Sequence, residues 1–589
     1  MGVFLYSGRM RTLHDSLRKY VSELISQKMD GVVTVSEVYD FLVEPPNPDL
    51  GDLAFGCFPL AKALKKGPPQ ISNELKLKIQ PDQVISKVEA VGPYLNISFT
   101  ATALGAHLLA PIQNGDHFKK ALTEKTQKTM VEFSQPNTHK ELHVGHMRNL
   151  CLGDALIRVL KYSGYDIVSS TFPGDVGTHV AKCLWYMKFH NTEAPPASGK
   201  GEWLGRMYSL GNNKLEDELG TPKEAQNRET LTMILHQLEA KSGEYYELWK
   251  ETREWSIELM KKVYQWADVR FDSWYWESDV DSDSVKYVKQ LFKDGQLIES
   301  QGAIGMDLEA DKLGFCLLLK KDGTGLYATK DVELARRKFN DFKIEKSVYV
   351  VDMRQALHFK QVFKVLETLG FEQAKDCFHL QYNFVELPDG AMSSRKGNIV
   401  PLLTLVKNME TMVKEQYLAR YANEWTVAEI NLVAEQVAKG AVKYGMLRID
   451  NNKKIVFDMA EWLKLDGESG PFIQYSFARI NSLCRKFNFN LNESVTYGLL
   501  EHPAERKLMQ SLIHFNTVAV RAAEEYRPSL LCTYLYEVAK KFNFFYHECS
   551  IAQAESPELK QARLALSYCT GQVLKQGLSL LGIPAPERM

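Results

Sequence analysis

Residues 128–178 read KTMVEFSQPNTHKELHVGHMRNLCLGDALIRVLKYSGYDIVSSTFPGDVGT. The stretch opens with an apolar run (128–134) typical of a strand, continues with helical periodicity from Met147 to Ser163, and reaches a second strand-like run at 165–172. Gly164 is placed to end the helix, and a glycine-rich turn (173–178) follows the second strand. A strand–helix–strand unit of this kind implies right-handed crossovers, so we expect an α/β fold built on a doubly wound parallel sheet.

The chain on either side of this unit divides into three expected domains. Residues 1–125 have the pattern of a small α/β unit, because helical patterns give way to the alternating run VISKVEAVGPYLNISFT (84–100). Residues 126–405 hold the parallel sheet, with a charged, helical insertion at about 186–270 and further strands at GFCLLLK (314–320) and KSVYVVD (346–352). Residues 406–589 are almost wholly helical in pattern, and this change of composition marks a boundary.

Composition describes an ordinary soluble chain and excludes few partners. Of the 589 residues, 45% are hydrophobic and 25% are charged, and no apolar run reaches the ~18 residues of a membrane span. The nine cysteines never stand at C-x-x-C spacing, which favours reduced thiols in the cytoplasm over a structural zinc site. The net charge of −1 excludes a strongly basic chain but not local basic faces.

The N-terminus lacks the long apolar core of a signal peptide, although a short transit sequence remains an alternative. An amphipathic helix is predicted by apolar residues at helical spacing, namely Leu13, Leu17, Val21, Leu24, Ile25 and Met29.

His143 and His146 stand where the first helix of the parallel sheet is expected to begin. Ligands of such sheets lie beyond the carboxyl ends of the strands, where unpaired N–H groups and the helix dipole attract anions. Gly145 lets a nucleotide approach the backbone, and two histidines three residues apart share one helix face. We therefore expect both imidazoles to donate hydrogen bonds to a phosphate as charge grows on it.

Two other interpretations of this pair stay open. Together with His139, the pair falls at i, i+4 and i+7, which could form a metal site, but Pro136 and the turn-like Pro-Asn-Thr stretch place His139 before the helix. The histidines could also simply cap or pack the helix.

Two glycine-containing loops add weaker signals. The loop AMSSRKGN (391–398) has the hydroxyls, cations and glycine suited to closing over a triphosphate, although a solvated basic loop shows the same pattern. In KKDGTGLYATKD (320–331), Gly323, Gly325 and Ala328 match a dinucleotide-binding fingerprint, which would make the protein an oxidoreductase. Alternatively, Tyr327 and Asp331 share a helix face and could hold a guanidinium group, or this could be an ordinary exposed helix.

Taken together, these strings resemble the class I arginyl-tRNA synthetases. The resemblance rests on H-V-G-H (143–146), MSSRKGN (392–398) and DGTGLYATKD (322–331), and it continues along the whole chain. The further matching strings are GDLAFGCFPLAKALKKGPPQIS (51–72), VGPYLNIS (91–98), VVDMRQALHFKQVF (350–363), GAVKYGMLRIDNNKKIVFD (440–458), GPFIQYSFARI (470–480) and LLGIPAPERM (580–589). Each string alone is weak evidence, but their order along the chain is specific.

The resemblance implies a Rossmann-like catalytic domain, an N-terminal domain that contacts the tRNA elbow and a helical anticodon-binding domain. It implies that L-arginine and ATP, with Mg²⁺, give arginyl-adenylate, and that arginine then passes to the terminal adenosine of tRNA(Arg). It further implies a cytoplasmic monomer with no tightly bound cofactor, no metal site of its own and no membrane contact. A non-catalytic RNA-binding relative is the alternative, which the intact histidine pair argues against.

The resemblance also assigns roles to individual residues of this sequence. The ATP-binding residues would be His143, Gly145, His146, Gly174, Asp175, Met392, Ser393, Ser394 and Arg395. The amino and carboxylate ends of arginine would meet Glu132, Ser134 and Asn137, and its guanidinium group would meet Tyr327, Asp331 and Gln355. Contacts to tRNA would come from Asn96, Tyr475 and Met589. Because lysine cannot reproduce the planar fork of arginine, selection needs no editing site.

The loop departs from the usual class I pattern K-M-S-K-S. Ala391 stands in place of the first lysine and Arg395 in place of the second. Many members of the family share the first change, and a lysine just before the histidine motif takes over. Here that residue is Lys140, with Lys396 as the rival; we expect both to act, with Lys140 primary.

Aromatic and cationic residues also alternate near the C-terminus, among them Tyr526, Arg527, Lys540, Lys541 and Tyr546. They could stack anticodon bases. We expect most of this helix to be core, because a single stripe joins Leu530, Tyr534, Val538 and Phe542.

Overall fold

The computed structural model describes residues 15–45, 47–119, 127–388, 390–391 and 401–589. Its centre is a five-stranded parallel sheet of order β12-β11-β5-β6-β7. The strands are β5 (Thr129–Glu132), β6 (Ile167–Thr171), β7 (Ser273–Trp274), β11 (Lys346–Asp352) and β12 (Cys377–Tyr382). The chain runs outward from β5 through β6 to β7 and then returns to β11 on the other side, so the strand order reverses between β5 and β11. The predicted doubly wound α/β fold is confirmed, and ligands are expected at this reversal.

Helix α7 (Val144–Tyr162) connects β5 to β6 and is buried along most of its length. The predicted end is confirmed, since Gly164 follows the helix with a φ of +96°, a conformation that favours glycine. Asn149, within the helix, donates to the carbonyl of Val350 at 2.8 Å and accepts from the N–H of Ser134 at 2.5 Å. The helix is therefore tied to the ends of β5 and β11, beside the strand reversal.

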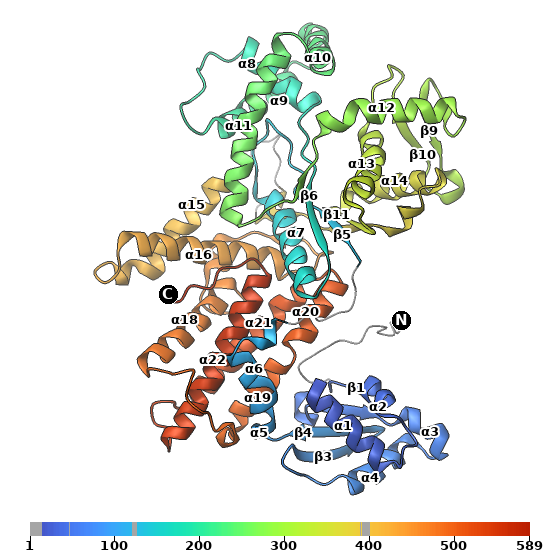
Figure 1. The fold of residues 1–589 in the computed structure, drawn as a ribbon. Helices are drawn as coiled ribbons and strands as arrows, with labels where there is room; N and C mark the ends of the chain where they lie inside the picture. Colours follow the sequence, from blue (N-terminus) through green and yellow to red (C-terminus); the bar gives the residue numbers. More distant parts are fainter. Residues whose placement is uncertain (1–14, 46, 120–126, 389, 392–400) are drawn as a thin grey trace.

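Two helical lobes rise from the carboxyl edge of the sheet (Figure 1). One is the predicted insertion, with helices α8 (Thr178–Phe189), α9 (Lys200–Asp217), α10 (Lys223–Glu239) and α11 (Glu244–Ala267). The other holds α12 (Glu277–Lys293), α13 (Tyr327–Phe342) and α14 (Ala356–Thr368) around a small sheet of β8 (Ile298–Ser300), β9 (Ala303–Asp307) and β10 (Phe315–Leu319). The strand predicted at 314–320 is β10, but it pairs antiparallel with β9 and does not join the parallel sheet.

The N-terminal domain is a four-stranded antiparallel sheet of order β1-β2-β4-β3 with helices on it. Its elements are α1 (Asp15–Lys28), α2 (Val35–Phe41), β1 (Leu42–Val43), β2 (Leu53–Gly56), α3 (Phe58–Leu64), α4 (Pro68–Lys78), β3 (Ile85–Val91) and β4 (Tyr94–Phe99). The predicted amphipathic stripe of α1 is confirmed within the described residues, where Leu17, Val21 and Ile25 are buried.

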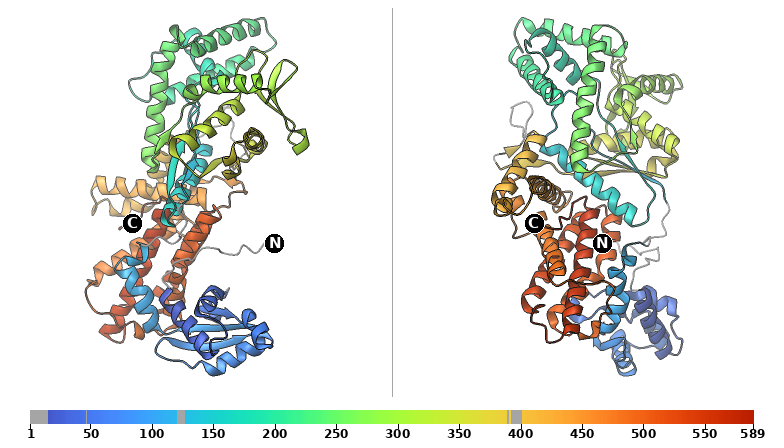
Figure 2. Two further views of the ribbon diagram at one scale, coloured as in Figure 1. Left: turned by 45° about the vertical axis from the view of Figure 1, so that its right-hand side comes forward. Right: turned by 60° about the vertical axis from the view of Figure 1, so that its left-hand side comes forward.

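After Phe99 the chain leaves this domain. Helices α5 (Ala101–Leu104) and α6 (Ala110–Gln113) pack among the C-terminal helices, although the expected N-terminal domain extended to residue 125. The rings of Phe118 and Phe515 meet edge to face at 5.6 Å. Figures 1 and 2 show the N-terminal sheet at the lower end of the molecule, next to the helical domain and remote from the parallel sheet.

The C-terminal region is helical as predicted, apart from β15 (Ile455–Val456), which pairs with β13 (Val385–Leu387). Its helices are α15 (Leu402–Val413), α16 (Val427–Leu447), α17 (Met459–Leu463), α18 (Gly470–Lys486), α19 (Pro503–Ile513), α20 (Phe515–Glu524), α21 (Ser529–Glu548) and α22 (Pro557–Leu580). On α21 the predicted core stripe is confirmed at Val538 and Phe542, whereas Leu530 is only half-buried.

Buried charges join helix α7 to the helical domain. Arg148 is 1% exposed and donates to the carbonyls of Asp450, Asn451 and Lys453. One helical turn and a half further on, Asp154 pairs with the fully buried Lys443 of α16 at 3.0 Å. The helix that carries the histidine motif thus has one end at the sheet edge and its body fixed to the helical domain.

No helix among the described residues is both long enough and apolar enough to cross a membrane.

Candidate active site

The histidine motif forms the first turn of α7, the helix that follows β5 along the chain. His143 is the N-cap residue, and its Nδ1 accepts a hydrogen bond from the N–H of Gly145 at 3.1 Å. His146 Nδ1 in turn accepts from the N–H of His143 at 3.1 Å. The rings lie 4.0 Å apart between centroids. Because both Nδ1 atoms accept, each neutral ring carries its hydrogen on Nε2 and presents that N–H as a donor.

Burial keeps this pair uncharged near neutral pH. Desolvation, reinforced by the charge of Lys140, lowers the pKa of His143 to about 4. Burial also lowers the pKa of His146 well below its ordinary value, with His143 and Lys140 as further causes. The capping interpretation is thus correct for Nδ1, but it leaves the Nε2 groups for a ligand.

Lys140 is the lysine whose charge affects both histidines of the motif. Its ammonium group lies 4.9 Å from the ring centroid of Tyr208 on α9. Its charge contributes to the lowered pKa values of His143, His146 and His179. The predicted phosphate-binding lysine therefore lies between the insertion and the histidine pair.

The segment between β5 and α7 forms a second wall. Ser134 has a φ of +55° and its hydroxyl lies 3.0 Å from that of Tyr264. Asn137 bridges to Gly174, and a Cβ on Gly174 would lie only 2.4 Å from Asn137 Oδ1. A side chain at position 174 would have to displace the amide of Asn137, which occupies that space. The structure thus brings together three predicted substrate residues from two separate loops.

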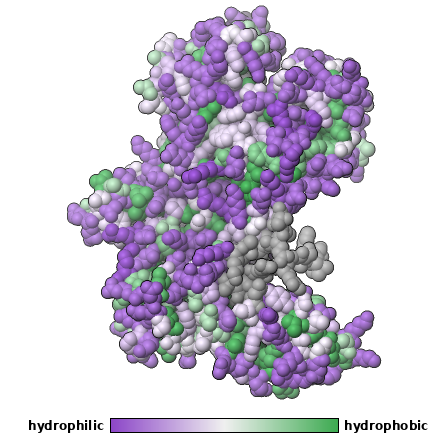
Figure 3. Space-filling model, in the orientation of Figure 1, coloured by the Kyte–Doolittle hydropathy of each residue, from purple (hydrophilic) through white to green (hydrophobic). Residues whose placement is uncertain are grey.

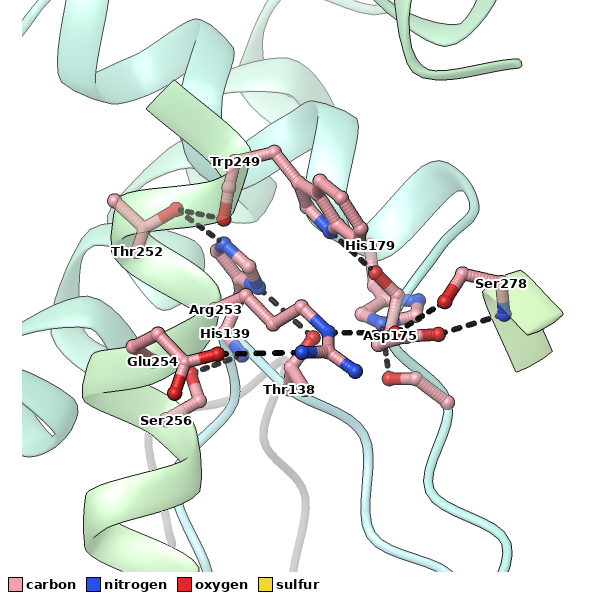
Figure 4. Close-up of polar contacts among 11 residues, drawn as sticks. Thr138, His139, Asp175, His179, Trp249, Thr252, Arg253, Glu254, Ser256 and Ser278 are labelled. Carbon is pink, nitrogen blue, oxygen red and sulfur yellow. Dashed lines mark hydrogen bonds and ion pairs between the residues drawn. The ribbon is translucent and has the colours of Figure 1, made fainter. Parts of the chain in front are cut away.

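Helix α11 of the insertion holds both loops from behind (Figure 4). His139, fully buried with a φ of +59°, has its Nδ1 2.9 Å from the hydroxyl of Thr138 and its Nε2 2.8 Å from that of Thr252. The backbone N–H of His139 donates to Ser256 Oγ at 2.9 Å. As expected, His139 lies before α7, and its ring faces α11 rather than the histidine pair.

Asp175 is anchored by the same helix. Its carboxylate is fully buried and accepts from Arg253 Nε at 2.7 Å and from both the N–H and the hydroxyl of Ser278. Its carbonyl accepts from the indole of Trp249 at 2.7 Å. Asp175 thus orients the Gly174 turn, and its contact with ATP stays a prediction.

Glu132, at the end of β5, is also buried. It forms an ion pair with the fully buried Lys338 of α13 and accepts from the amide of Gln135 at 3.2 Å. Lys338 neutralises this carboxylate in the core. An arginine substrate that contacts Glu132, as predicted, would therefore share the carboxylate with a protein cation.

Asp331 and His358 meet where α13 packs against α14. Asp331 Oδ2 lies 2.5 Å from Nε2 of His358, on α14. Tyr327, one turn before Asp331, is 66% exposed, and Gln355 precedes α14 on the exposed side. Of the predicted guanidinium-binding residues, Tyr327 interacts electrostatically with Asp331, and Gln355 lies at the start of the helix that carries His358. The sequence analysis did not predict His358 as part of this surface.

Glu277 links this surface to the Gly174 turn. Its carboxyl carbon would lie 3.5 Å from a Cβ on Gly174, and its Oε2 lies 3.4 Å from Nζ of Lys330. Burial raises the pKa of Glu277 to about 7 despite the opposing charge of Lys330. Perturbed carboxyl groups of this kind cluster at functional sites. Sequence reasoning missed Glu277, Arg253 and His358, and only the position of His358, three residues after Gln355, offered a signal.

The residues predicted to close over ATP and pyrophosphate, Met392, Ser393, Ser394, Arg395 and Lys396, lie outside the described residues. The chain on both sides of them is placed. β14 (Gly390–Ala391) pairs antiparallel with β13, and on the far side the N–H of Leu402 donates to the carbonyl of Leu142 at 2.9 Å. Pro401 bridges to His143, so the segment that follows the loop returns directly to the histidine motif.

The predicted tRNA contacts differ in exposure. Asn96 is 3% exposed within β4, and Met589 is 9% exposed and packs into the core. Tyr475 lies half-buried under the guanidinium group of Arg479, which is 4.9 Å from its ring centroid. Gly470 and Pro471 begin the same helix, α18, with Ser469 as the N-cap.

Two alternatives can be compared with the geometry. The described residues contain no group of at least three His, Cys, Asp or Glu side chains placed to hold a metal ion. The fingerprint at Gly323 does lie between a strand and a helix, but the strand, β10, belongs to the antiparallel sheet. A dinucleotide site also needs an acidic residue about 20 residues further on, at the end of the next strand. The residue near that place, Asp341, lies within α13, where it accepts from the hydroxyl of Tyr275 at 3.1 Å. A βαβ dinucleotide unit is thus absent at this place.

The open face above the sheet is visible in Figure 3, where pale and hydrophobic side chains gather between the hydrophilic rims of the two upper lobes. This mixture of apolar lining with a few convergent polar groups is typical of a small-molecule site.

Comparison with known proteins agrees with this architecture. Three family models match: "tRNA synthetases class I (R), catalytic domain" over residues 108–459, "DALR anticodon binding domain" over 473–589, and "Arginyl tRNA synthetase N terminal domain" over 13–99. The arginine–tRNA ligase of Bdellovibrio bacteriovorus is 63% identical over 581 residues, which is 98% of this chain and 100% of that protein. That of Clostridium botulinum is 34% identical, over 97% of this chain and 99% of that protein.

The solved arginyl-tRNA synthetase of Thermus thermophilus superposes with a TM-score of 0.77 at 26% identity, covering 97% of this chain and 100% of that one. The Plasmodium falciparum enzyme superposes with a TM-score of 0.74 at 20% identity, over 98% of this chain and 100% of that one, which shows a shared fold.

Proposed function

Because this chain belongs to the class I arginyl-tRNA synthetases and is an arginine–tRNA ligase, we propose that the crevice between its two lobes carries out both steps of that reaction. In the first step, the carboxylate of L-arginine attacks the α-phosphate of ATP, giving arginyl-adenylate and pyrophosphate. In the second, the arginyl group passes to the 3′-terminal adenosine of tRNA(Arg). The observation that carries the proposal is the pair of histidines at the start of α7, whose Nδ1 atoms both accept backbone N–H bonds and so leave two Nε2–H donors for a phosphate.

The histidine pair stabilises the charge that builds on the α-phosphate. Two neutral donors fixed by backbone hydrogen bonds need no reorganisation during the reaction, and such fixed donors are worth about 2.7–4 kcal/mol each. Gly145 leaves room for the adenosine, and the Gly174 turn, held by Asp175, forms the opposite side. Lys140 and Lys396 neutralise the pyrophosphate, with Lys140 primary, and the loop from Met392 to Arg395 covers ATP.

Magnesium enters as the ATP complex, since this ion is usually held by substrate phosphates and only a few carboxylates. No step that we assign to the protein depends on it.

Arginine lies between the Ser134–Asn137 segment and the start of α13. Ser134 and Asn137 hold its amino and carboxylate ends, together with Glu132, whose carboxylate is shared with Lys338. Asp331 accepts the guanidinium fork, flanked by Tyr327 and Gln355. Lysine offers one ammonium group to an acceptor built for a planar fork, and a buried acceptor left unpaired costs about 1–3 kcal/mol. Selection by this pocket therefore needs no editing site.

The tRNA contacts the two outer domains. Tyr475 and Met589 contact the anticodon side of the tRNA, and Asn96 contacts its elbow side. Because Asn96 and Met589 are nearly buried, only a small part of each side chain is exposed for such a contact. The enzyme acts in the cytoplasm and as a monomer. Equilibrium sedimentation of the purified protein tests the monomeric state.

The direct test is attachment of labelled arginine to total tRNA, with lysine and citrulline as competitors. We expect arginine alone to be attached and neither competitor to reduce the yield at equal concentration. Attachment of another amino acid, or none in the presence of tRNA and ATP, would overturn the assignment. Exchange of pyrophosphate should be measured with tRNA present, because members of this family typically activate the amino acid only then.

A further inference from the structure

The carboxylate that is assigned to the guanidinium group already has a partner. His358 Nε2 lies 2.5 Å from Oδ2 of Asp331, and the described part of the chain provides no donor to Oδ1. Both side chains are mostly buried, with 24% of His358 and 16% of Asp331 exposed. A donor and an acceptor this close in a partly desolvated place form a strong, charge-assisted hydrogen bond.

The arrangement fixes the direction of the free oxygen. Asp331 lies on α13 and His358 on α14, and these two helices pack against each other. The ring of His358 is itself held edge-on by Phe359, at 5.2 Å between centroids. A carboxylate held at one oxygen by a fixed ring cannot rotate freely, so Oδ1 keeps one orientation.

The groups that surround His358 come from several elements. Asp331 faces it from α13, and His379 of β12 interacts with it electrostatically, as well as with Asp352 at the end of β11. Farther away, Glu277 and Tyr327 interact with Asp331 but not directly with the ring. Asp331 is thus the carboxylate in hydrogen-bond contact with His358.

We infer that His358 is a positioning residue for arginine recognition: it holds Asp331 in the orientation that accepts the guanidinium fork, and it releases a proton to solvent when that cation binds. The inference rests on the assignment of Asp331 as the guanidinium acceptor. It deepens that assignment, because it makes arginine affinity depend on the protonation of a second residue.

The sign of the effect follows from charge. When His358 is protonated, the pair with Asp331 is neutral overall and attracts a second cation weakly. When His358 is neutral, it still donates from Nε2, and the pair carries one negative charge that the guanidinium group satisfies. Burial by itself would lower the pKa of His358, but the hydrogen bond and charge of Asp331 raise it above the ordinary value. Arginine should therefore bind more tightly as pH rises through the neutral range.

The test is calorimetric titration of L-arginine into the full-length protein, saturated with uncharged tRNA, at pH values of about 6, 7 and 8, in pairs of buffers with different ionisation heats. For the natural protein we expect the dissociation constant to fall several-fold from the lowest to the highest pH, with a fraction of a proton released per arginine bound. His358→Gln keeps a donor at the position of Nε2 but cannot ionise, so it should bind arginine with less than a twofold change over the same range and no proton release.

The matched control is His236→Gln, a histidine with 73% of its side chain exposed on α10, which should behave as the natural protein. If His358→Gln keeps the pH dependence, the proton comes from another group such as Glu277, and the inference is wrong. Measurement on the natural protein decides independently of that variant: arginine binding without proton release also overturns it. Absence of arginine binding altogether would instead refute the proposed function.

Discussion

At the scale of single residues, the site works through groups whose state is set by what they contact. The two motif histidines hold backbone N–H groups with Nδ1 and so keep Nε2–H for a ligand. Sequence spacing predicted that both face one ligand, because residues three apart share a helix face. It could not predict His358 or Glu277, since their partners lie far away along the chain and only the fold brings them together.

Replacing Lys140 tests the cation that substitutes for the missing loop lysine. We expect Lys140→Ala to lower the rate of pyrophosphate exchange by about 10²–10³-fold, the usual effect of removing one charge-stabilising contact, with little change in the arginine KM. Lys140→Arg should recover part of the rate, because it restores the charge. An unchanged exchange rate for Lys140→Ala would remove this residue from the mechanism.

At the scale of elements, helix α11 is the main support of the site. From one face it holds the loop before α7 through Thr252 and Ser256, and the Gly174 turn through Arg253 (Figure 4). The sequence predicted a helical insertion here, but periodicity reports only which face is buried and not which side chains it supports. The same limit explains β10, whose apolar run fitted a strand in either sheet.

Removing the guanidinium group of Arg253 tests this support. Arg253→Met leaves the carboxylate of Asp175 buried without its charged partner, and breaking a buried pair in this way costs about 3–5 kcal/mol. We expect a loss of that size in the free energy of unfolding by urea, together with a higher arginine KM. Glu254→Ala, at the next and largely exposed position, should stay within about 0.5 kcal/mol of the natural protein. Equal stability of Arg253→Met and Glu254→Ala would contradict the role of α11.

At the scale of the whole molecule, three structural regions are joined by buried polar contacts. Asp52 of the N-terminal domain is 3% exposed and pairs with Arg506 and Gln510 of α19. Arg148 and Lys443 join the active-site helix to the helical domain. The sequence predicted the number and class of the domains from changes in pattern. It could not show that residues 101–118 cross to the helical domain, because short helices carry no mark of the surface they cover.

Tyr475 tests the anticodon side. Loss of one stacked base typically costs about 1–3 kcal/mol, so we expect Tyr475→Ala to raise the KM for tRNA by roughly 5- to 100-fold, with arginine affinity intact. Aminoacylation kinetics with varied tRNA measure the effect, and Val427→Ala, 75% exposed at the start of α16, serves as the control. Equal tRNA KM values in Tyr475→Ala and the natural protein would count against the contact.

The buried histidines make the stability of the protein depend on pH. Burial lowers the pKa of His139 to about 3 and that of His143 to about 4, and it lowers those of His146 and His179 further below their ordinary value. Between about pH 4.5 and 6.5 the unfolded chain binds these protons and the folded chain does not, so stability falls as pH falls. Glu141 and Glu277, whose pKa values burial raises to about 7, oppose this effect with two protons bound in the folded state.

The four histidines outnumber these two carboxyl groups, so the unfolding free energy should fall as pH falls over this range. Urea unfolding at several pH values from about 6.5 down to about 5 checks the slope. Stability that stays constant or increases over this range would show that the histidines are not held neutral in the folded protein.

The contacts of α7 with the helical domain also limit how the protein can be divided. A fragment ending near residue 405 would keep Arg148 and Asp154 but lose the three carbonyls that Arg148 binds and the lysine that pairs with Asp154. Asp154 would keep its ion pair with Arg158, whereas the buried guanidinium group of Arg148 would lose those acceptors. Such a fragment should be insoluble or partly unfolded rather than a minimal ligase. The catalytic and helical domains must then be exchanged together or redesigned at this contact, so grafting a foreign anticodon-binding domain onto this catalytic core requires matching acceptors for Arg148 and a cation for Asp154.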